Sequence, residues 1–227
     1  MSVDLKEYDN NVIDLMNKNK NYYDDINKGY QNIEAYYKGH IDRIHNAIGM
    51  LNDNIVLEEN AYVHEAGSIF PFMSLSLTYK ANVYVEVSSI QNRPLRLTNF
   101  VYLRYGNLCY DDFGNEICDL IITTEVFEHL SCNLLIVRDK IIKSIKKGGY
   151  WFVSFPMNGR NASMSNYNKE WCNDEVVGKV GFSDYTERHL REFNEETVKQ
   201  FLDISNMKII ANDKKTGWIH QFLLKKD

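Results

Sequence analysis

The spacing of apolar residues predicts that helices and strands alternate after residue 40. Ile41, Ile44, Ile48 and Leu51 recur at intervals of three or four residues, which is typical of a helix with one apolar face. Short apolar runs of strand length follow at residues 61–65, 83–87, 100–103, 120–123 and 150–154.

A second helix is predicted between the fourth and fifth of these runs. Its apolar residues recur at helical spacing, at Leu134, Val137, Ile141 and Ile145. Lysines crowd its last turn, where cations suit the helix dipole, and Gly148 and Gly149 are expected to end it. Strand, helix and strand in succession predict a parallel sheet with helices on both faces.

The two ends of the chain differ from this middle part. The first 38 residues are rich in Asn, Lys, Asp and Tyr, and we expect one or two amphipathic helices there that pack onto the rest as a cap. At the other end, "ETVKQFLDIS" predicts a helix. The stretches "MKIIAND" and "WIHQFLLKK" predict two strands that pair antiparallel. We therefore divide the chain into a cap, 1–38, and one main domain, 39–227.

Composition narrows the function classes. A chain of 227 residues with 44% hydrophobic content can bury a substantial core. Its net charge is -5 and its basic residues form no block longer than a pair, which argues against nucleic acid as the main partner. No apolar run approaches the roughly 18 residues of a membrane helix, so we expect no membrane association and a cytoplasmic protein. Four cysteines without a C-x-x-C pair are expected to be reduced, packed thiols.

The sequence lacks the motifs of a metal site and of a serine hydrolase. The six histidines are dispersed without H-x-x-x-H spacing, so we expect no functional metal. No G-x-S-x-G elbow is present, which disfavours a serine hydrolase.

The turn after the first predicted strand is a candidate ligand loop. Glu65, Ala66 and Gly67 would lie at the carboxyl edge of a parallel sheet, where open sheets of this type bind ligands. Glu86, 21 positions later, is expected to end the next strand and could accept hydrogen bonds from a ribose diol. The alternative is a tight turn and a solvated strand-end charge. With one glycine, the loop favours a nucleoside without phosphates over a pyrophosphate.

Residues 118–130, "CDLIITTEVFEHL", carry the strongest signal. With "KGG" at 147–149 and Pro156 they resemble class I S-adenosylmethionine-dependent methyltransferases of the small-molecule group. The resemblance covers about residues 60–160. It implies a Rossmann-like α/β fold with a mostly parallel seven-stranded sheet, an antiparallel C-terminal strand, helices on both faces and an N-terminal helical cap.

The resemblance also implies a cofactor site for S-adenosylmethionine, with S-adenosylhomocysteine as product. Gly67 and its neighbours Glu65 and Ala66 would pass beneath the methionine part, and Glu86 would hold the ribose. The other cofactor contacts implied are Asn107 and Leu108 near adenine, and Thr124 and Glu125 near the sulfonium. Ile69 stands where the family usually has a second glycine.

Two histidines are candidate bases for deprotonating an acceptor hydroxyl. His129 follows the fourth strand beside Glu128; alternatively it packs in the turn. His189 follows the fifth strand, in a region, 157–192, where this fold often carries substrate-binding insertions. Its neighbours Arg188 and Arg191 could hold an anionic acceptor, or form ion pairs at a solvated helix start.

The N-terminal tyrosines allow two interpretations as well. Tyr37 and its neighbours could form an aromatic lid that contacts the substrate, but packing of a helix onto the sheet is favoured.

These observations favour a methyltransferase that acts on a small polar molecule, with oxygen as the acceptor. Stretches like that around His189 occur in methyltransferases of bacterial surface-sugar and natural-product pathways, and a homodimer is possible. The alternative is a catalytically inactive, methyltransferase-like binding protein with a degenerate cofactor loop. A nicotinamide-dependent dehydrogenase is disfavoured because the glycine fingerprint is missing.

Overall fold

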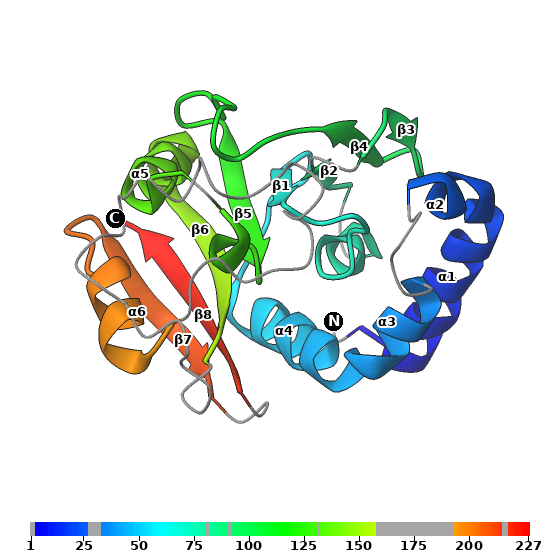
Figure 1. Cartoon of the computed structure of the whole chain (residues 1–227), viewed down its shortest axis with the longest axis horizontal. Helices are drawn as coiled ribbons and strands as arrows, with labels where there is room; N and C mark the ends of the chain where they lie inside the picture. The colour runs from blue at the N-terminus through cyan, green and yellow to red at the C-terminus, as the bar shows by residue number, and fades with distance from the viewer. Residues whose placement is uncertain are drawn as a thin grey trace.

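One mixed sheet forms the centre of the computed structural model, which describes residues 3–26, 33–79, 82–89, 92–130, 132–157, 193–214 and 218–227. The sheet has eight strands in the order β3-β4-β2-β1-β5-β6-β8-β7 (Figure 1). Their bounds are β1 Tyr62–Ala66, β2 Tyr84–Ser89, β3 Leu95–Arg96, β4 Val101–Tyr105, β5 Cys118–Thr124, β6 Ile145–Pro156, β7 Met207–Asp213 and β8 Ile219–Lys226.

The strand directions confirm the predicted sheet. Strands β4, β2, β1, β5 and β6 are parallel, and β8 is antiparallel to both β6 and β7. The edge strand β3, which pairs antiparallel with β4, was not predicted because two residues give no readable pattern. It brings the sheet from the expected seven strands to eight.

Side chains cap the first amides of three helices, α1, α5 and α6. The helix bounds are α1 Leu5–Lys18, α2 Lys20–Ile26, α3 Ile33–Gly39, α4 Ile41–Asn54, α5 Leu134–Ser144 and α6 Glu195–Phe201, with 3-10 turns η1 Ser74–Tyr79 and η2 Phe127–His129. Asp4 caps α1, Asn133 caps α5, and Asn194 forms a capping box with Thr197 at α6. The predicted helix from Ile41 is confirmed as α4, which begins without a side-chain cap.

Alternating side chains divide the core into two layers, one on each face of the sheet. Leu120 and Ile122 of β5 pack in the same cluster as Ile44 and Ile48 of α4. The intervening Ile121 belongs to the opposite cluster, with residues of α5 and α6. Helices therefore cover both faces, as predicted, and Figure 1 shows α5 and α6 on the β6 to β8 side of the molecule.

The N-terminal helices join the first of these core layers. Within the described residues, three helices form there instead of one or two, and α1 to α3 gather beyond the β2 side of the sheet (Figure 1). Tyr23 lies 5.7 Å from the Phe70 ring, and Tyr37 stacks 5.3 Å from Phe72. The packing interpretation is confirmed for these two tyrosines, whereas the domain boundary at residue 38 stays a prediction.

The end of α5 differs from expectation. The helix ends at Ser144, and Ile145 already begins β6, so Gly148 and Gly149 lie within a strand. The buried Lys226 ammonium donates to the carbonyls of Ile142 and Ile145, at 3.1 and 2.6 Å, which satisfies the helix terminus. Gly148 has a φ of 76°, and the pairing of β5 with β6 shifts at this irregularity. Tertiary contacts therefore end the helix before the glycines.

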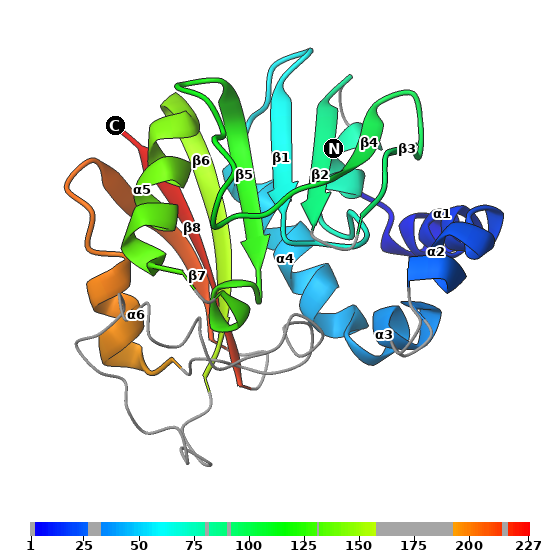
Figure 2. The same ribbon diagram turned by 45° about the horizontal axis from the view of Figure 1, so that its top comes forward.

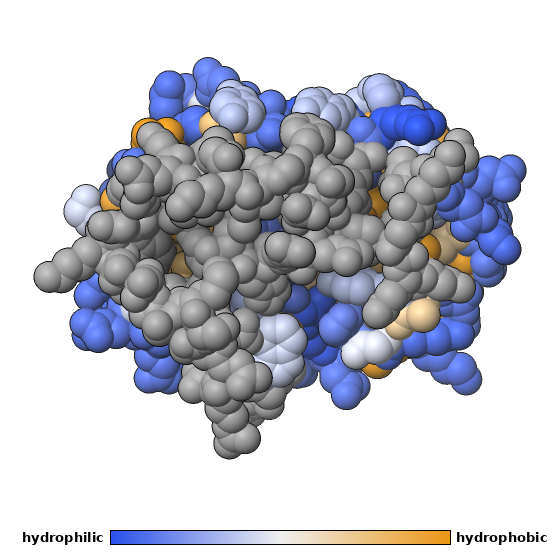
Figure 3. All heavy atoms as spheres, in the orientation of Figure 1, coloured by the Kyte–Doolittle hydropathy of each residue, from blue (hydrophilic) through white to orange (hydrophobic). Residues whose placement is uncertain are grey.

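The described surface on the side shown in Figure 3 is largely hydrophilic, with small separate hydrophobic areas. No helix within the described ranges is long and apolar enough to cross a lipid bilayer.

Candidate functional site

The carboxyl ends of the parallel strands meet at one edge of the sheet. In Figure 2 the arrowheads of β1, β2 and β5 point to this edge, and α4 passes close to it. From β1 the chain continues to β2 on one side, whereas β5 continues to β6 on the other. The gap between β1 and β5 is therefore the topological switch point, where open α/β sheets bind ligands.

The turn after β1 is packed tightly at this switch point. Gly67 has a φ of 89°, and a β-carbon there would lie 2.4 Å from a methyl group of Val126, so only glycine fits. Further along the loop, Phe70 and Phe72 are buried among the N-terminal tyrosines. The two phenylalanine rings thus occupy the inside of the loop.

Glu65 anchors this loop from within. The carboxylate is fully buried and accepts hydrogen bonds from the backbone amide and hydroxyl of Ser74, at 3.0 and 2.5 Å. Burial raises the pKa of Glu65 to about 7. Ala66, beside it, packs in the core layer of α5 and α6. These contacts hold η1 against the end of β1.

Glu86 does not end its strand, and that part of the sequence prediction was wrong. Strand β2 continues to Ser89, and Ser88 is the residue opposite Ala66 at the sheet edge. Glu86 accepts a hydrogen bond from Arg104 Nε at 2.8 Å. The apolar alternation stops at the two serines, which made the strand look shorter than it is. The ribose-binding role for Glu86 therefore loses its positional support.

A buried histidine lies next to Glu86. His64 Nε2 is 2.7 Å from Ser88 Oγ and 3.8 Å from Glu86 Oε1. Burial lowers the pKa of His64 to about 4, so the ring is neutral at physiological pH. Sequence reasoning missed this cluster because its members come from different strands.

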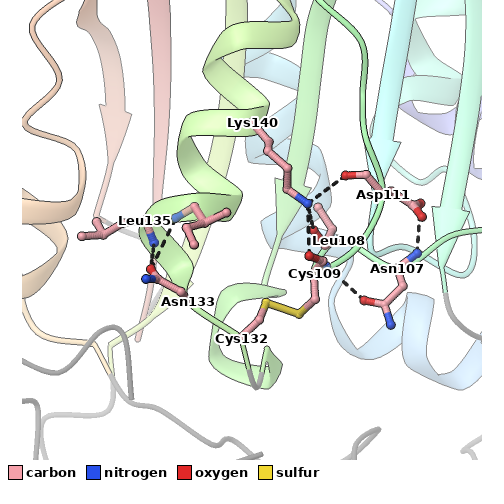
Figure 4. Close-up of a disulfide and its surroundings, with 9 residues drawn as sticks. Asn107, Leu108, Cys109, Asp111, Cys132, Asn133, Leu135 and Lys140 are labelled. Carbon is pink, nitrogen blue, oxygen red and sulfur yellow. Dashed lines mark hydrogen bonds between the residues drawn. A yellow bond between two sulfur atoms is a disulfide. The ribbon is translucent and has the colours of Figure 1, made fainter. Parts of the chain in front are cut away.

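The loop after β4 is held by its own polar groups. Asn107 Oδ1 accepts from the Cys109 amide at 3.0 Å, and Asp111 accepts from the Asn107 amide at 3.0 Å. Lys140 of α5 donates to the carbonyls of Leu108, Cys109 and Asp111, as Figure 4 shows. The Asn107 carbonyl, predicted to contact adenine, is thus already bonded within its loop, and Leu108 is buried.

A disulfide joins this loop to the segment before α5, contrary to the expectation of reduced thiols. Cys109 and Cys132 are bonded, with their Cα atoms 5.7 Å apart (Figure 4). They are 23 residues apart in sequence, and only the fold brings them together. Cys118 is a buried free thiol, as expected, and Cys172 lies outside the described residues.

The segment after β5 gathers the ionisable groups of the edge. Glu125 has a φ of 52°, uncommon for a residue other than glycine, and its carboxylate forms an ion pair with Arg43 of α4. Arg43 also donates to the Tyr36 hydroxyl at 2.8 Å and is only 7% exposed. Thr124, next to Glu125, lies 4.0 Å from the Met73 sulfur. Arg43 was missed because it lies 82 residues before its partner.

Glu128 is a buried acid with unused hydrogen-bonding capacity. Neither of its side-chain oxygens has a hydrogen-bond partner among the described residues, and the residue is 1% exposed. Burial raises the pKa of Glu128 to about 8. His129 Nε2 lies 3.8 Å from Glu128 Oε1. Both residues, adjacent in sequence, lie just after the end of β5, and their catalytic role stays a prediction.

The remaining predicted site residues are Tyr37 and three residues of the 157–192 region. Tyr37 is fully buried, and its hydroxyl donates to Asp9 at 2.5 Å, as the packing interpretation expects. A substrate contact for Tyr37 stays a prediction. His189, Arg188 and Arg191 lie outside the described residues. Within the described part of the chain, no group of three His, Cys, Asp or Glu side chains could hold a metal ion.

A surface hollow of about 550 Å³ lies at the other end of the sheet. Its lining includes Arg138 and Lys143 of α5, residues 203–206 before β7, and Lys226 at the end of β8. None of the predicted site residues lines it, so we do not assign the site to this hollow.

Comparisons with known proteins identify the fold. No protein-family model matches this chain, and no curated protein matches it either. Among solved structures, a candidate sarcosine dimethylglycine methyltransferase from Galdieria sulphuraria aligns with a TM-score of 0.59 and 11% identity, over 82% of this chain and 86% of its own. The chain has the class I methyltransferase fold.

Further structures with this methyltransferase fold carry bound ligands. Phosphoethanolamine N-methyltransferase 2 from Haemonchus contortus, solved with phosphomonomethylethanolamine and S-adenosylhomocysteine, aligns with a TM-score of 0.58 and 11% identity, over 91% of this chain and 60% of its own. An O-methyltransferase family 2 protein from Planctomyces limnophilus, in complex with apigenin, aligns at 0.54 and 10%, over 85% and 61%. The predicted methyltransferase fold is confirmed.

Proposed function

We propose that this chain is an S-adenosylmethionine-dependent methyltransferase that acts on a small polar molecule. The observation that carries the proposal is the segment after β5. It places Glu125, Glu128 and His129 at the switch point of a methyltransferase fold, beside the Gly67 turn.

Polar atoms near this segment fit a bound ligand. Within the described ranges, both Glu128 oxygens, Arg43 Nε and Gln221 Oε1 are buried without a hydrogen-bond partner. Buried polar groups normally have hydrogen-bond partners. The donors and acceptors of a bound ligand would supply the partners that these atoms lack. The residues expected to hold the cofactor's ribose fit it less well, because Glu86 already accepts a hydrogen bond from Arg104 and β2 ends in serines.

The residues after β5 would align and deprotonate the acceptor. The cofactor would supply an activated methyl group on a good leaving group, so the protein has chiefly to orient the nucleophile. We assign the base to His129, whose side chain is 28% exposed and therefore within reach of a bound acceptor. Glu128, mostly protonated at neutral pH, would hold the imidazole or the acceptor by a hydrogen bond.

The acceptor class is part of the same proposal. We propose a hydroxyl acceptor on a sugar or natural product of bacterial surface-polysaccharide type, with Arg188, Arg191 and His189 as further candidates for acceptor contacts. A cytoplasmic location and a homodimer remain proposals as well.

A second candidate function is favoured by the loop after β1. Phe70 and Phe72 are buried inside this loop. Val126 packs against Gly67, and Glu86 forms an ion pair with Arg104. A methyltransferase-like binding protein without catalysis would have these features.

Calorimetric titration and a methyl-transfer assay together separate the two candidates. We expect S-adenosylhomocysteine to bind the purified chain and NAD not to bind. Incubation of the chain with small-molecule extracts and a labelled methyl donor should then yield a labelled product. Binding without transfer to any fraction favours the inactive candidate. No detectable binding of S-adenosylhomocysteine at millimolar concentration contradicts the methyltransferase proposal.

A further inference from the structure

We propose that the Cys109–Cys132 disulfide is a reversible redox modification site: a dithiol opens it in the folded chain, and opening it releases the connection between β4 and β5. This connection comprises residues 106–117, and the disulfide ties it to the segment between β5 and α5. The proposal goes beyond the proposed function, because it holds whether or not the chain transfers methyl groups.

The disulfide closes a covalent loop around part of the candidate site. Cys109 lies in the connection after β4, and Cys132 directly precedes Asn133, the N-cap of α5 (Figure 4). The two cysteines are 23 residues apart, and the intervening chain includes β5 and the turn η2 with Glu128 and His129. Neither cysteine belongs to a strand, so opening the bond removes a restraint near the site and leaves the sheet paired.

Only non-covalent contacts hold the connection once the bond is open. Residues 106–117 form no helix and no strand. The Lys140 ammonium of α5 donates to three carbonyls of this connection, at 2.9, 3.2 and 2.8 Å. Segments with few regular hydrogen bonds open at a low cost in free energy, while the core stays folded. Reduction is therefore expected to loosen the connection without unfolding the chain.

The two bonded cysteines are accessible to a thiol, unlike the third described cysteine. Cys109 and Cys132 are half-buried, and Tyr110, next to Cys109, is 79% exposed. Cys118 is completely buried, and burial raises the pKa of its thiol to about 12. A thiol that stays protonated and buried is inert toward disulfides and alkylating reagents. The described part of the chain thus presents a single thiol–disulfide couple to solvent.

Positive charge near the disulfide stabilises the thiolates that reduction produces. Cys132 lies at the N-terminal end of α5, where the helix dipole favours a negative charge. The Lys140 ammonium lies 3.2 Å from the carbonyl oxygen of Cys109, so a cation is close to the other cysteine as well. A stabilised thiolate is a better leaving group, which favours thiol–disulfide exchange at this bond.

The exchange needs a dithiol as its co-reactant. A thiolate of the dithiol attacks one sulfur of the disulfide, which forms a mixed disulfide and expels the other cysteine as a thiolate. The second thiol of the reductant then attacks the mixed disulfide, releases the first cysteine and forms a disulfide within the reductant. The chain gains two electrons and two protons, and the dithiol loses them.

Alkylation followed by peptide mapping of the full chain tests whether the bond opens in the folded state. After millimolar dithiothreitol without denaturant, iodoacetamide should label Cys109 and Cys132, whereas Cys118 serves as the internal control and should remain unlabelled. Oxidised glutathione should then restore the bond. The proposal is overturned if the pair is labelled only after urea is added, or if the oxidised chain contains no Cys109–Cys132 bond.

Hydrogen exchange tests whether opening the bond releases the connection. The amides of Cys109, Tyr110 and Asp111 are hydrogen-bonded within it, to the Asn107 side chain or carbonyl. Reduction should speed up their exchange about tenfold, and the amides of β8 should change less than about twofold. A double variant, Cys109→Ser with Cys132→Ser, should exchange like the reduced parent with and without dithiothreitol.

Two further outcomes contradict the proposal. Equal exchange of the connection in the oxidised and reduced parent would mean that the bond does not restrain it. Loss of cooperative unfolding on reduction would mean that the bond is required for the fold as a whole. The reduced parent decides both points even if the double variant does not fold. Neither measurement uses the cofactor, so the result is independent of the proposed function.

Discussion

At the scale of single residues, the fold gives neighbouring ionisable groups different surroundings. Glu128 is buried without a hydrogen-bond partner among the described residues, whereas the His129 side chain is 28% exposed. The buried carboxyl keeps its proton to a higher pH than an exposed one, since burial penalises the charged form and raises the pKa of Glu128. Burial of Glu128 therefore costs stability, and it leaves a polar group unsatisfied at the site.

Glu128→Gln should make the stability of the chain less dependent on pH. Because burial raises the pKa of Glu128 from 4.5 to about 8, the folded chain holds a proton that the unfolded chain releases above pH 4.5. This contribution to stability is complete below about pH 4.5 and is lost as the pH rises to about 8. Glutamine cannot ionise, so the variant should gain stability relative to the parent by on the order of a few kcal/mol across this window.

Urea unfolding of parent and variant at pH 5 and at pH 8 measures this difference. Glu58→Gln, at an exposed position, controls for the substitution itself. A constant difference between parent and Glu128→Gln at both pH values would contradict the buried, protonated state.

At the scale of elements, α5 fixes the loop that follows β4. Lys140 donates to three carbonyls of that loop, and the Cys109–Cys132 disulfide fastens the same loop to the segment before α5. Burial lowers the pKa of Lys140, which is consistent with an ammonium that has exchanged water for carbonyl oxygens. The loop lies at the carboxyl edge, so its shape bears directly on any ligand there.

Lys140→Met should lower the free energy of unfolding by about 1 to 3 kcal/mol, because carbonyls of a part-buried loop lose their donor. Chemical denaturation with the disulfide intact measures the loss. Lys143→Met, one turn along the same helix and exposed, should have a much smaller effect. Equal losses of unfolding free energy in the two variants would show that the hydrogen bonds from Lys140 to the loop contribute nothing to stability.

At the scale of the whole molecule, the N-terminal helices and the sheet share one core layer. Tyr8, Val12 and Met16 of α1 are buried in the same cluster as the strands β1 and β2, and the Tyr8 hydroxyl donates to the Phe72 carbonyl. Removing the helices would expose the aromatic side chains of the loop after β1 to water.

Deletion of residues 1–38 should therefore abolish cooperative unfolding, as followed by circular dichroism on heating. Tyr22→Phe, which keeps a ring in place and removes only the hydroxyl bonded to the backbone of Arg93, should unfold cooperatively. A truncated chain that melts as cooperatively as the full one would support a separable cap with its boundary at residue 38.

The sequence predicted the parallel core of the fold because its signals are local. Apolar runs mark β1, β2, β4, β5 and β6, and the helical spacing from Ile41 marks α4. The sequence pattern predicted the ends of elements less well. The polar Ser88 and Ser89 made β2 look shorter than it is, and α5 ends before Gly148, where Lys226 bonds its last carbonyls. In both places a contact from elsewhere in the fold overrides the local pattern.

The sequence alone determined the order of strands and helices along the parallel core. It also determined which ionisable residues follow β5, namely Glu125, Glu128 and His129. Tertiary structure alone decided which charges meet. Arg43 reaches Glu125, Arg104 holds Glu86, and Cys109 joins Cys132, because parallel strands bring distant segments to one edge. Periodicity is set by neighbours along the chain, whereas partnerships between charges depend on the path of the chain in space.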